Sequence, residues 1–338
     1  MPDSSTVAAR RAPDTDASRI SFKLATVLPD GAPSTTELKT AADALATASG
    51  DTVKLKLYFG VVGDEQDIVR KLELGQLQAA HLTAFGLAQI VPAIHVLDLP
   101  FFFSSYAQVD HVYENTFAYF QHAFREKGFE LLAFTETGWV HLYSNSRIED
   151  LDGLRGAKIW AAEGDPLIAA FASEARMPMV TLGIPDVLQS LQTGLIDTVY
   201  ASPSAMIGLQ WFTKVKYVQP LAFAHATGGL VMTTKAFDSL DRDRQAILAR
   251  TIAAQAKSMT DSSRRVNEDS KAVIAQAGVE VLPRPSRETF QRLRDVSNRV
   301  IDLQADKLYP KVLLERVRAL RDEAGGSRAQ HDMQRHDS

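Results

Sequence analysis

The side chains in this sequence that could do chemistry do not form a common catalytic motif. The chain has no cysteine, so it offers no thiol nucleophile, zinc-thiolate site or disulfide. It contains no G-x-S-x-G, H-E-x-x-H, P-loop or G-x-G-x-x-G segment. An enzyme would need a general base in a cleft, and only Glu163, His81 and His141 are candidates. The sequence therefore favours a protein that binds a molecule over one that transforms it.

Composition indicates an ordinary globular protein. The 338 residues are 45% hydrophobic, enough for packed cores in roughly two domains. The net charge is -4, so no nucleic-acid partner is expected. No apolar stretch approaches the ~18 residues of a membrane span. Residues 1–19 carry no apolar run of the signal-peptide kind and are predicted to be a disordered tail, as are the polar residues 326–338.

Strand and helix patterns alternate along the chain. VKLKLYF at 53–59 alternates apolar and polar side chains, which predicts a strand with one buried face. In 105–127 aromatic and apolar residues recur every three or four positions, which predicts a helix. Further strands are predicted at 20–28, 79–83, 129–145 and in AKIW, MVTL, IDTVYAS and GGLVMTT. Further helices are predicted at 34–49, 64–75, 204–214, 241–277 and 286–324, the last interrupted near Pro310. This alternation favours an α/β fold with mostly parallel strands flanked by helices.

A repeated sequence pattern suggests that the chain has two similar halves. LELGQLQAAHLTA at 72–84 and LQTGLIDTVYASP at 191–203 both predict a helix, a glycine stop and a strand. Gly75 and Gly194 take the same place in the two segments, where a helix end needs a left-handed residue. A helix–strand joint of this kind is also common to α/β folds in general, so both explanations stay open.

Four segments together resemble the DctP-type solute receptors of TRAP transporters. They are VVGDEQDIVRKLELGQLQAAHLTAFGLAQIVPAIHVLDLPFFF, GLRGAKIW, PDVLQSLQTGLIDTVYASPSAMIGLQWF and LVMTTKAFDSLDRDRQAIL. The resemblance covers roughly residues 20–325, in the family's order and spacing. It implies a type II periplasmic-binding-protein fold with two lobes, each a mixed, mostly parallel sheet flanked by helices, and a long helix spanning both.

The resemblance also implies boundaries and a binding place. The first lobe would comprise 20–137 plus 229–266, and the second 138–228 plus 267–325. Strands near 137–145 and 224–232 would link them. The ligand would lie between the lobes, at the ends of the strands.

The chain departs from the family at the residues expected to bind a carboxylate. Many members bind carboxylates through an arginine on the strand after G-L-(K/R)-G, because a guanidinium forms two parallel hydrogen bonds with a carboxylate. Here that strand reads Lys158-Ile159-Trp160. A second family arginine falls at Val140. Because a buried carboxylate without a cation is costly, the expected ligand is apolar or amphipathic.

Eleven residues are predicted to contact this ligand. The aromatic and apolar ones are Trp160, Trp139, Val140, Tyr200, Phe59 and Trp211, and the polar ones are His141, His81, Thr83, Glu163 and Ser202. The tryptophans have core packing as an alternative role, and His141, which should share a strand face with Trp139, has a structural hydrogen bond as its alternative. Asp64 and Asp165 are predicted to cap helices. Aromatic faces beside Glu163 would also suit an ammonium group, so a cationic ligand is a further alternative.

The resemblance implies an extracytoplasmic receptor located in the periplasm. It would close on its small-molecule ligand by a hinge and deliver it to a separate TRAP-type membrane permease. No cofactor and no metal are expected. A monomer is expected, with a dimer through the C-terminal helices as the alternative. Two other functions stay open: a lipid-, hydrophobe- or partner-binding protein on the same fold, and an enzyme on that fold.

Overall fold

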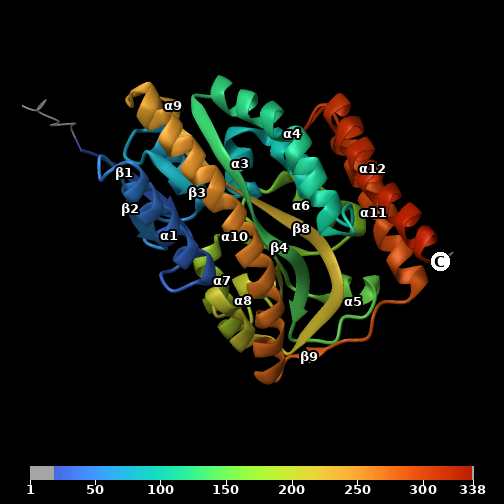
Figure 1. The fold of residues 1–338 in the computed structure, drawn as a ribbon. Coiled ribbons are helices and arrows are strands. Elements are labelled where there is room, and N and C mark those ends of the chain that lie inside the picture. Colours follow the sequence, from blue (N-terminus) through green and yellow to red (C-terminus); the bar gives the residue numbers. More distant parts are fainter. Residues whose placement is uncertain (1–18, 337–338) are drawn as a thin grey trace, which may run out of the picture.

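One sheet runs through both halves of the molecule (Figure 1). The computed structural model describes residues 19–336, with side chains described through residue 325. Eight of its nine strands lie in the order β2-β1-β3-β8-β4-β7-β5-β6, and the ninth, β9, pairs with β8. The tails predicted at 1–19 and 326–338 lie outside the described residues. The exceptions are residue 19 and the backbone of 326–336. The predicted mixed α/β architecture with two lobes is confirmed.

The first lobe is built on three parallel strands. They are β1 (Ile20–Thr26), β2 (Val53–Phe59) and β3 (Ala79–Thr83). The helices around them are α1 (Pro33–Ala48), α2 (Glu65–Glu73), α3 (Ala84–Ile90), η1 (Pro92–Leu97) and α4 (Tyr106–Glu126). Asp64 caps α2 through a reciprocal capping box with Asp67, which confirms the predicted cap.

The second lobe repeats this plan with shorter elements. Its parallel strands are β5 (Ile159–Ala162), β6 (Met179–Leu182) and β7 (Thr198–Ala201). Its helices are α5 (Leu151–Gly156), α6 (Pro166–Ala175), α7 (Ile184–Thr193), α8 (Pro203–Gly208) and η2 (Trp211–Lys214). Gly75 and Gly194 are both left-handed, with φ of 72° and 73°. The single helix predicted at 204–214 is wrong, because Gln210 is left-handed and separates α8 from η2.

Two long strands belong to both lobes and join them. β4 (Phe129–Ser144) and β8 (Tyr217–Thr233) are antiparallel neighbours along nearly their whole length. Their register shifts at several places, one of them between Glu136 and Gly138. Gly138 has a φ of 100°, and a side chain there would collide with the Asn267 amide. The crossing between the lobes is therefore shaped by a bulge that requires glycine.

The C-terminal helices pack across the molecule. After α9 (Thr234–Asp238), α10 (Arg242–Gln276) contacts α1 of the first lobe, α8 of the second and β4. A short strand β9 (Glu280–Val281) precedes α11 (Arg287–Gln304), which packs on α6. The last helix, α12 (Lys311–His336), packs on α4 of the first lobe, although its residues to 325 were expected in the second. The exact lobe boundaries stay a prediction.

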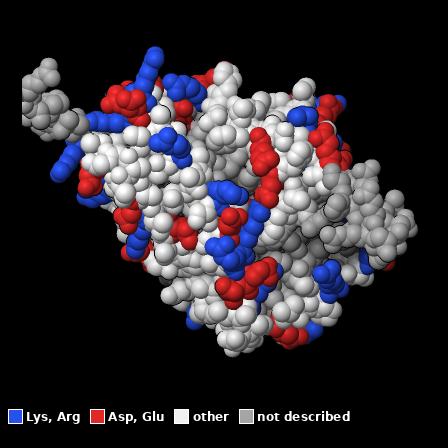
Figure 2. Space-filling view, in the orientation of Figure 1, with Lys and Arg blue, Asp and Glu red and all other residues white. Residues whose placement is uncertain are grey.

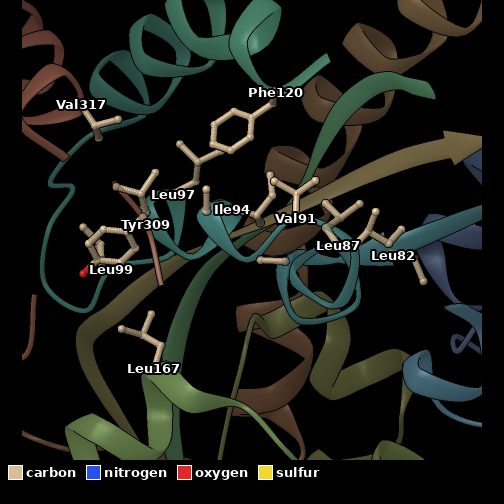
Figure 3. Close-up of a cluster of buried hydrophobic side chains, with 14 of the residues drawn as sticks. Leu82, Leu87, Val91, Ile94, Leu97, Leu99, Phe120, Leu167, Tyr309 and Val317 are labelled. Carbon is tan, nitrogen blue, oxygen red and sulfur yellow. The ribbon is translucent and has the colours of Figure 1, made fainter. Parts of the chain in front are cut away.

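The largest hydrophobic cluster extends from one lobe into the other (Figure 3). Leu97 and Leu99 of the first lobe, Leu167 of α6 and Val317 of α12 are members of it, each 6% exposed or less. The two lobes therefore share a continuous apolar contact. No helix in the described part of the chain is long and apolar enough to cross a bilayer.

Candidate functional site

The loops at the strand ends of the two lobes touch one another. The Gln66 amide at the start of α2 donates a hydrogen bond to the backbone oxygen of Glu163, at 2.6 Å. A Cβ placed on Gly183, before α7, would lie 3.8 Å from Cβ of Asp64. Gly208 of α8 lies against Ala32 at the start of α1. The structure is thus a closed arrangement of the lobes, with the strand ends facing each other.

Trp160 belongs to an aromatic group in the second lobe. Its ring stacks on Tyr200 with centroids 5.0 Å apart and meets Trp211 edge-on at 5.2 Å. The indole N–H donates a hydrogen bond to the backbone oxygen of Leu182 at 3.0 Å. Trp160 is 5% exposed and Trp211 is 2% exposed. The structure therefore brings these three predicted site residues together, and no cation–π contact involves any of them among the described residues.

Trp139, Val140 and His141 are consecutive on β4 but have different neighbours. The Trp139 ring contacts Tyr106 of α4 and His225 of β8, at 5.4 and 5.2 Å. Val140 is buried. His141 lines a separate cavity beside Lys271 and Ile274 of α10. The pairing shifts between Val140 and His141 because β8 has an extra residue there, so β4 keeps its own alternation and the shared face of Trp139 and His141 stays a prediction.

His141 is held by a backbone contact. Its Nδ1 lies 3.1 Å from the backbone oxygen of Gln219, and its Nε2 has no partner among the described residues. Burial lowers the pKa of this imidazole, so the neutral ring donates from Nδ1.

The polar residues predicted in the first lobe are occupied by internal contacts. His81 Nε2 lies 3.0 Å from Thr135 Oγ1, and burial lowers the pKa of His81 to about 4. Thr83 donates from its backbone N–H and its hydroxyl to the carboxyl group of Glu65, at 2.7 and 2.5 Å. Glu65 also accepts from the backbone N–H of Gly86 and is 1% exposed, so it holds the β3–α3 turn. Nothing in its sequence context had marked Glu65.

The remaining predicted residues are dispersed. The Phe59 ring packs beside the first-lobe core under the Lys39 ammonium, at 5.4 Å. The side chain of Glu163 is exposed, and only its backbone oxygen joins the interlobe contact. Ser202 caps α8 by accepting from the backbone N–H of Ala205. These three residues do not lie around Trp160, as they would if all the predicted residues lined one binding site.

An apolar cavity adjoins Tyr200 of the Trp160 group. Its volume is about 70 Å³. The sheet side is formed by Leu142, Ile159, Met179 and Tyr200, and α6 contributes Ile168 and Phe171. Residues of α11, the hinge strand β8 and the loop after η1 close the other sides. Among the described residues, no Lys or Arg lines this cavity.

Two carboxyl groups and a histidine lie where the lobes meet on the η1 side. Asp98 accepts a hydrogen bond from the backbone N–H of Thr227 at 2.8 Å, and burial raises its pKa to about 7. Asp165 caps α6 through the backbone N–H groups of Leu167 and Ile168, which confirms the predicted cap. Burial raises the pKa of Asp165, and the nearby His95 opposes that rise. Sequence patterns did not identify His95 and Asp98 because the contact joins segments far apart in the chain.

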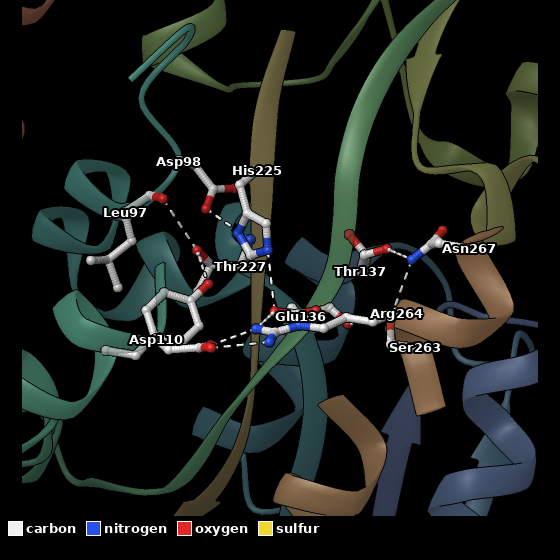
Figure 4. A network of polar contacts seen from close by, with 11 residues as sticks. Leu97, Asp98, Asp110, Glu136, Thr137, His225, Thr227, Ser263, Arg264 and Asn267 are labelled. Carbon is white, nitrogen blue, oxygen red and sulfur yellow. Dashed lines mark hydrogen bonds and ion pairs between the residues drawn. The ribbon is translucent and has the colours of Figure 1, made fainter. Parts of the chain in front are cut away.

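A network of charged groups fixes the crossing of β4 and β8 (Figure 4). Arg264 of α10 donates to both carboxyl oxygens of Glu136, at 2.8 and 2.9 Å, and its guanidinium also pairs with Asp110. His225 Nε2 lies 3.2 Å from Glu136. Burial alone would raise the pKa of Glu136, but the hydrogen bonds from His225 and Arg264 outweigh it and hold that pKa below its usual value. Elsewhere on the face shown in Figure 2, positive and negative groups are interspersed.

Comparison with known proteins agrees with this architecture. The family model described as bacterial extracellular solute-binding protein, family 7, matches residues 24–305. A solute-binding protein of Verminephrobacter eiseniae is 23% identical over 277 residues, 80% of each chain.

Solved structures show the same fold at low sequence identity. The sugar acid binding protein of Advenella mimigardefordensis, in complex with galactonate, has a TM-score of 0.85 and 18% identity over 90% of this chain and 99% of that one. A TRAP periplasmic solute-binding protein of Roseobacter denitrificans, with bound β-D-glucuronate, has a TM-score of 0.80 and 20% identity over 89% and 99%. The chain belongs to the DctP family, family 7 of the bacterial extracellular solute-binding proteins, which are receptors of TRAP transporters and not enzymes.

Proposed function

We propose that this chain is the periplasmic receptor of a TRAP-type transporter and that its ligand has no carboxylate. It binds a small apolar or amphipathic molecule between the lobes and passes it to the membrane permease. The family membership supports the transport role. The ligand class is supported by one observation: where the resemblance places a carboxylate-binding arginine, Trp160 is stacked on Tyr200 and hydrogen-bonded to Leu182.

The surroundings of Trp160 favour the same ligand class. Within the part of the chain that the structure describes, the adjoining cavity has no cationic lining residue. Burial raises the pKa of both buried carboxyl groups at the η1 side, Asp98 and Asp165, and neither supplies a positive charge to an anion. The solved neighbours named above hold galactonate and β-D-glucuronate, both sugar acids. A carboxylate in this chain's site would be desolvated without a paired guanidinium, at a cost of several kcal/mol.

The closest experimental test is a calorimetric titration of the ligand-free protein with D-glucuronate and galactonate. We expect neither sugar acid to bind. Saturable binding of either one would overturn the proposed ligand class while leaving the family assignment intact. Competition between the sugar acid and any molecule that copurifies with the protein would show whether both use the same site.

A further inference from the structure

We infer that the cavity beside His141 is a second binding site, for a small uncharged molecule that carries a hydrogen-bond donor on an apolar body. The cavity lies between the two long strands β4 and β8, the C-terminal end of α10, and β9. Its lining residues do not include Trp160, Tyr200 or Trp211. The inference therefore goes beyond the proposed function and does not rest on it.

The cavity is large enough for a molecule with one ring. Its volume is about 170 Å³. An engineered apolar cavity of about 150 Å³ in another protein binds benzene. The aromatic and aliphatic walls include Tyr143, Ile274 and Val279, each 4% exposed or less. An apolar ring or a short alkyl chain would therefore cover walls that water solvates poorly.

Two buried side chains that line the cavity each have a polar atom without a hydrogen-bond partner among the described residues. These atoms are Nε2 of His141 and Oε1 of Gln219, and both residues are 8% exposed. The other polar atoms of the two side chains are occupied. His141 Nδ1 lies 3.1 Å from the backbone oxygen of Gln219, and the Gln219 amide nitrogen donates to the backbone oxygen of Ile148. Because an unpaired buried polar atom is unfavourable, a ligand that pairs with either atom is stabilised here.

Both unpaired atoms are acceptors. A backbone oxygen can only accept, so Nδ1 of His141 carries the proton and Nε2 of the neutral ring accepts. Burial lowers the pKa of His141, which keeps the ring neutral at neutral pH. Oε1 of Gln219 is the acceptor end of its amide. The site therefore selects a ligand with an O–H or N–H group.

The charges around the cavity disfavour an ionic ligand. The Lys271 ammonium lies at the cavity, where it pairs with Glu268 at 2.7 Å and would repel a cationic ligand. A carboxylate has no proton to donate to His141 Nε2 or to Gln219 Oε1. An uncharged ring with one hydroxyl group meets both requirements, and phenol is the simplest probe of this kind.

The test compares phenol with anisole, which has the same ring without the hydroxyl donor. Binding is followed by an NMR titration of the ligand-free protein labelled in its isoleucine methyl groups. Ile274 lines the cavity, whereas Ile252 on the same helix packs in the first-lobe core. In the wild type, phenol should shift the Ile274 signal and leave the Ile252 signal in place. Anisole should bind roughly tenfold more weakly, because it leaves the acceptors unpaired.

Two variants on α10 locate the site. Ala275→Trp places a large ring in the cavity. Ala272→Trp is the matched control, because it places the same ring on the same helix at an exposed residue that does not line the cavity. We expect the phenol-dependent shift of Ile274 to persist in Ala272→Trp and to disappear in Ala275→Trp.

Three results would overturn the inference. Absence of a phenol-dependent shift of Ile274 in the wild type would mean that the cavity takes up water only. Equal affinity for phenol and anisole would mean that the acceptors do not select a donor. An equal shift of Ile274 in both tryptophan variants would place the bound phenol elsewhere. None of these results depends on whether sugar acids bind, so they are distinguishable from failure of the proposed ligand class.

Discussion

Trp160 and Tyr200 stack across the neighbouring strands β5 and β7, with ring centroids 5.0 Å apart and ring planes 30° apart. Trp160 occupies the position at which the family resemblance expects an arginine. Tyr200 faces the apolar cavity from the other side. This pair therefore presents aromatic surface in the second lobe where the family resemblance expects a cationic anchor.

Replacing Trp160 tests whether that surface sets the ligand class. Trp160→Arg should lower the melting temperature, because it removes a buried ring, a loss of about 3–5 kcal/mol for comparable truncations, and buries a guanidinium without a partner. D-glucuronate should raise the melting temperature of this variant and leave that of the wild type unchanged. Trp160→Phe is the control, since it retains an aromatic ring without adding charge. A Trp160→Arg protein as stable as the wild type would contradict the buried stack.

The contact between Asp64 and Gly183 allows the closed state to be locked. A Cβ on Gly183 would lie 3.8 Å from Cβ of Asp64, which matches the usual Cβ–Cβ separation in a disulfide. The chain has no native cysteine to compete. We expect Asp64→Cys combined with Gly183→Cys to form a disulfide under oxidation.

The oxidised double variant should release bound ligand far more slowly than its reduced form, as measured by exchange with labelled ligand. The two single variants are the controls, and Asp64→Cys also accounts for the loss of the α2 cap, about 1 kcal/mol. If the disulfide forms and exchange is equally fast in both forms, the contact does not close the binding site.

Asp98 should give the protein a specific pH dependence of stability. Burial raises its pKa in the folded state from 3.8 to about 7. The folded state therefore retains the proton where the unfolded chain has lost it. The resulting stabilisation is fully present below about pH 4 and is lost as pH rises through about 7, at a rate of at most about 1.4 kcal/mol per pH unit.

Asp98→Asn retains an oxygen acceptor for the Thr227 N–H and cannot titrate. Urea unfolding at pH 5 and pH 8 should show a smaller loss of unfolding free energy in Asp98→Asn than in the wild type. The comparison isolates Asp98 from the other buried groups, such as Glu65, whose pKa is also raised by burial. Identical pH dependence in the two proteins would show that Asp98 is ionised in the folded state.

Local signals in the sequence predicted the scaffold well. The caps at Asp64 and Asp165 and the left-handed Gly75 and Gly194 follow from short-range backbone chemistry, and the structure confirms them. The period-two pattern of 53–59 likewise gave β2 with its observed ends. The family resemblance, which depends on several segments in order, supplied the two-lobed topology that local patterns leave open.

Features that depend on distant contacts were missed. The register between β4 and β8 shifts after Val140, and a strand's own alternation does not reveal where its partner slips. The apolar cavity beside Tyr200 arises between β5–β7 and α11, which are more than eighty residues apart in the chain, so its apolar residues appear in the sequence as ordinary core. The hydrogen bond from the Thr83 hydroxyl to the Glu65 carboxyl group is likewise visible only in three dimensions.

The most direct test of the central claim is mass spectrometry of the small molecules released by denaturing the protein after native purification from the organism that makes it. The proposal predicts an amphipathic or apolar molecule without a carboxylate, at close to one molecule per chain. A sugar acid or another carboxylate at that stoichiometry would contradict it.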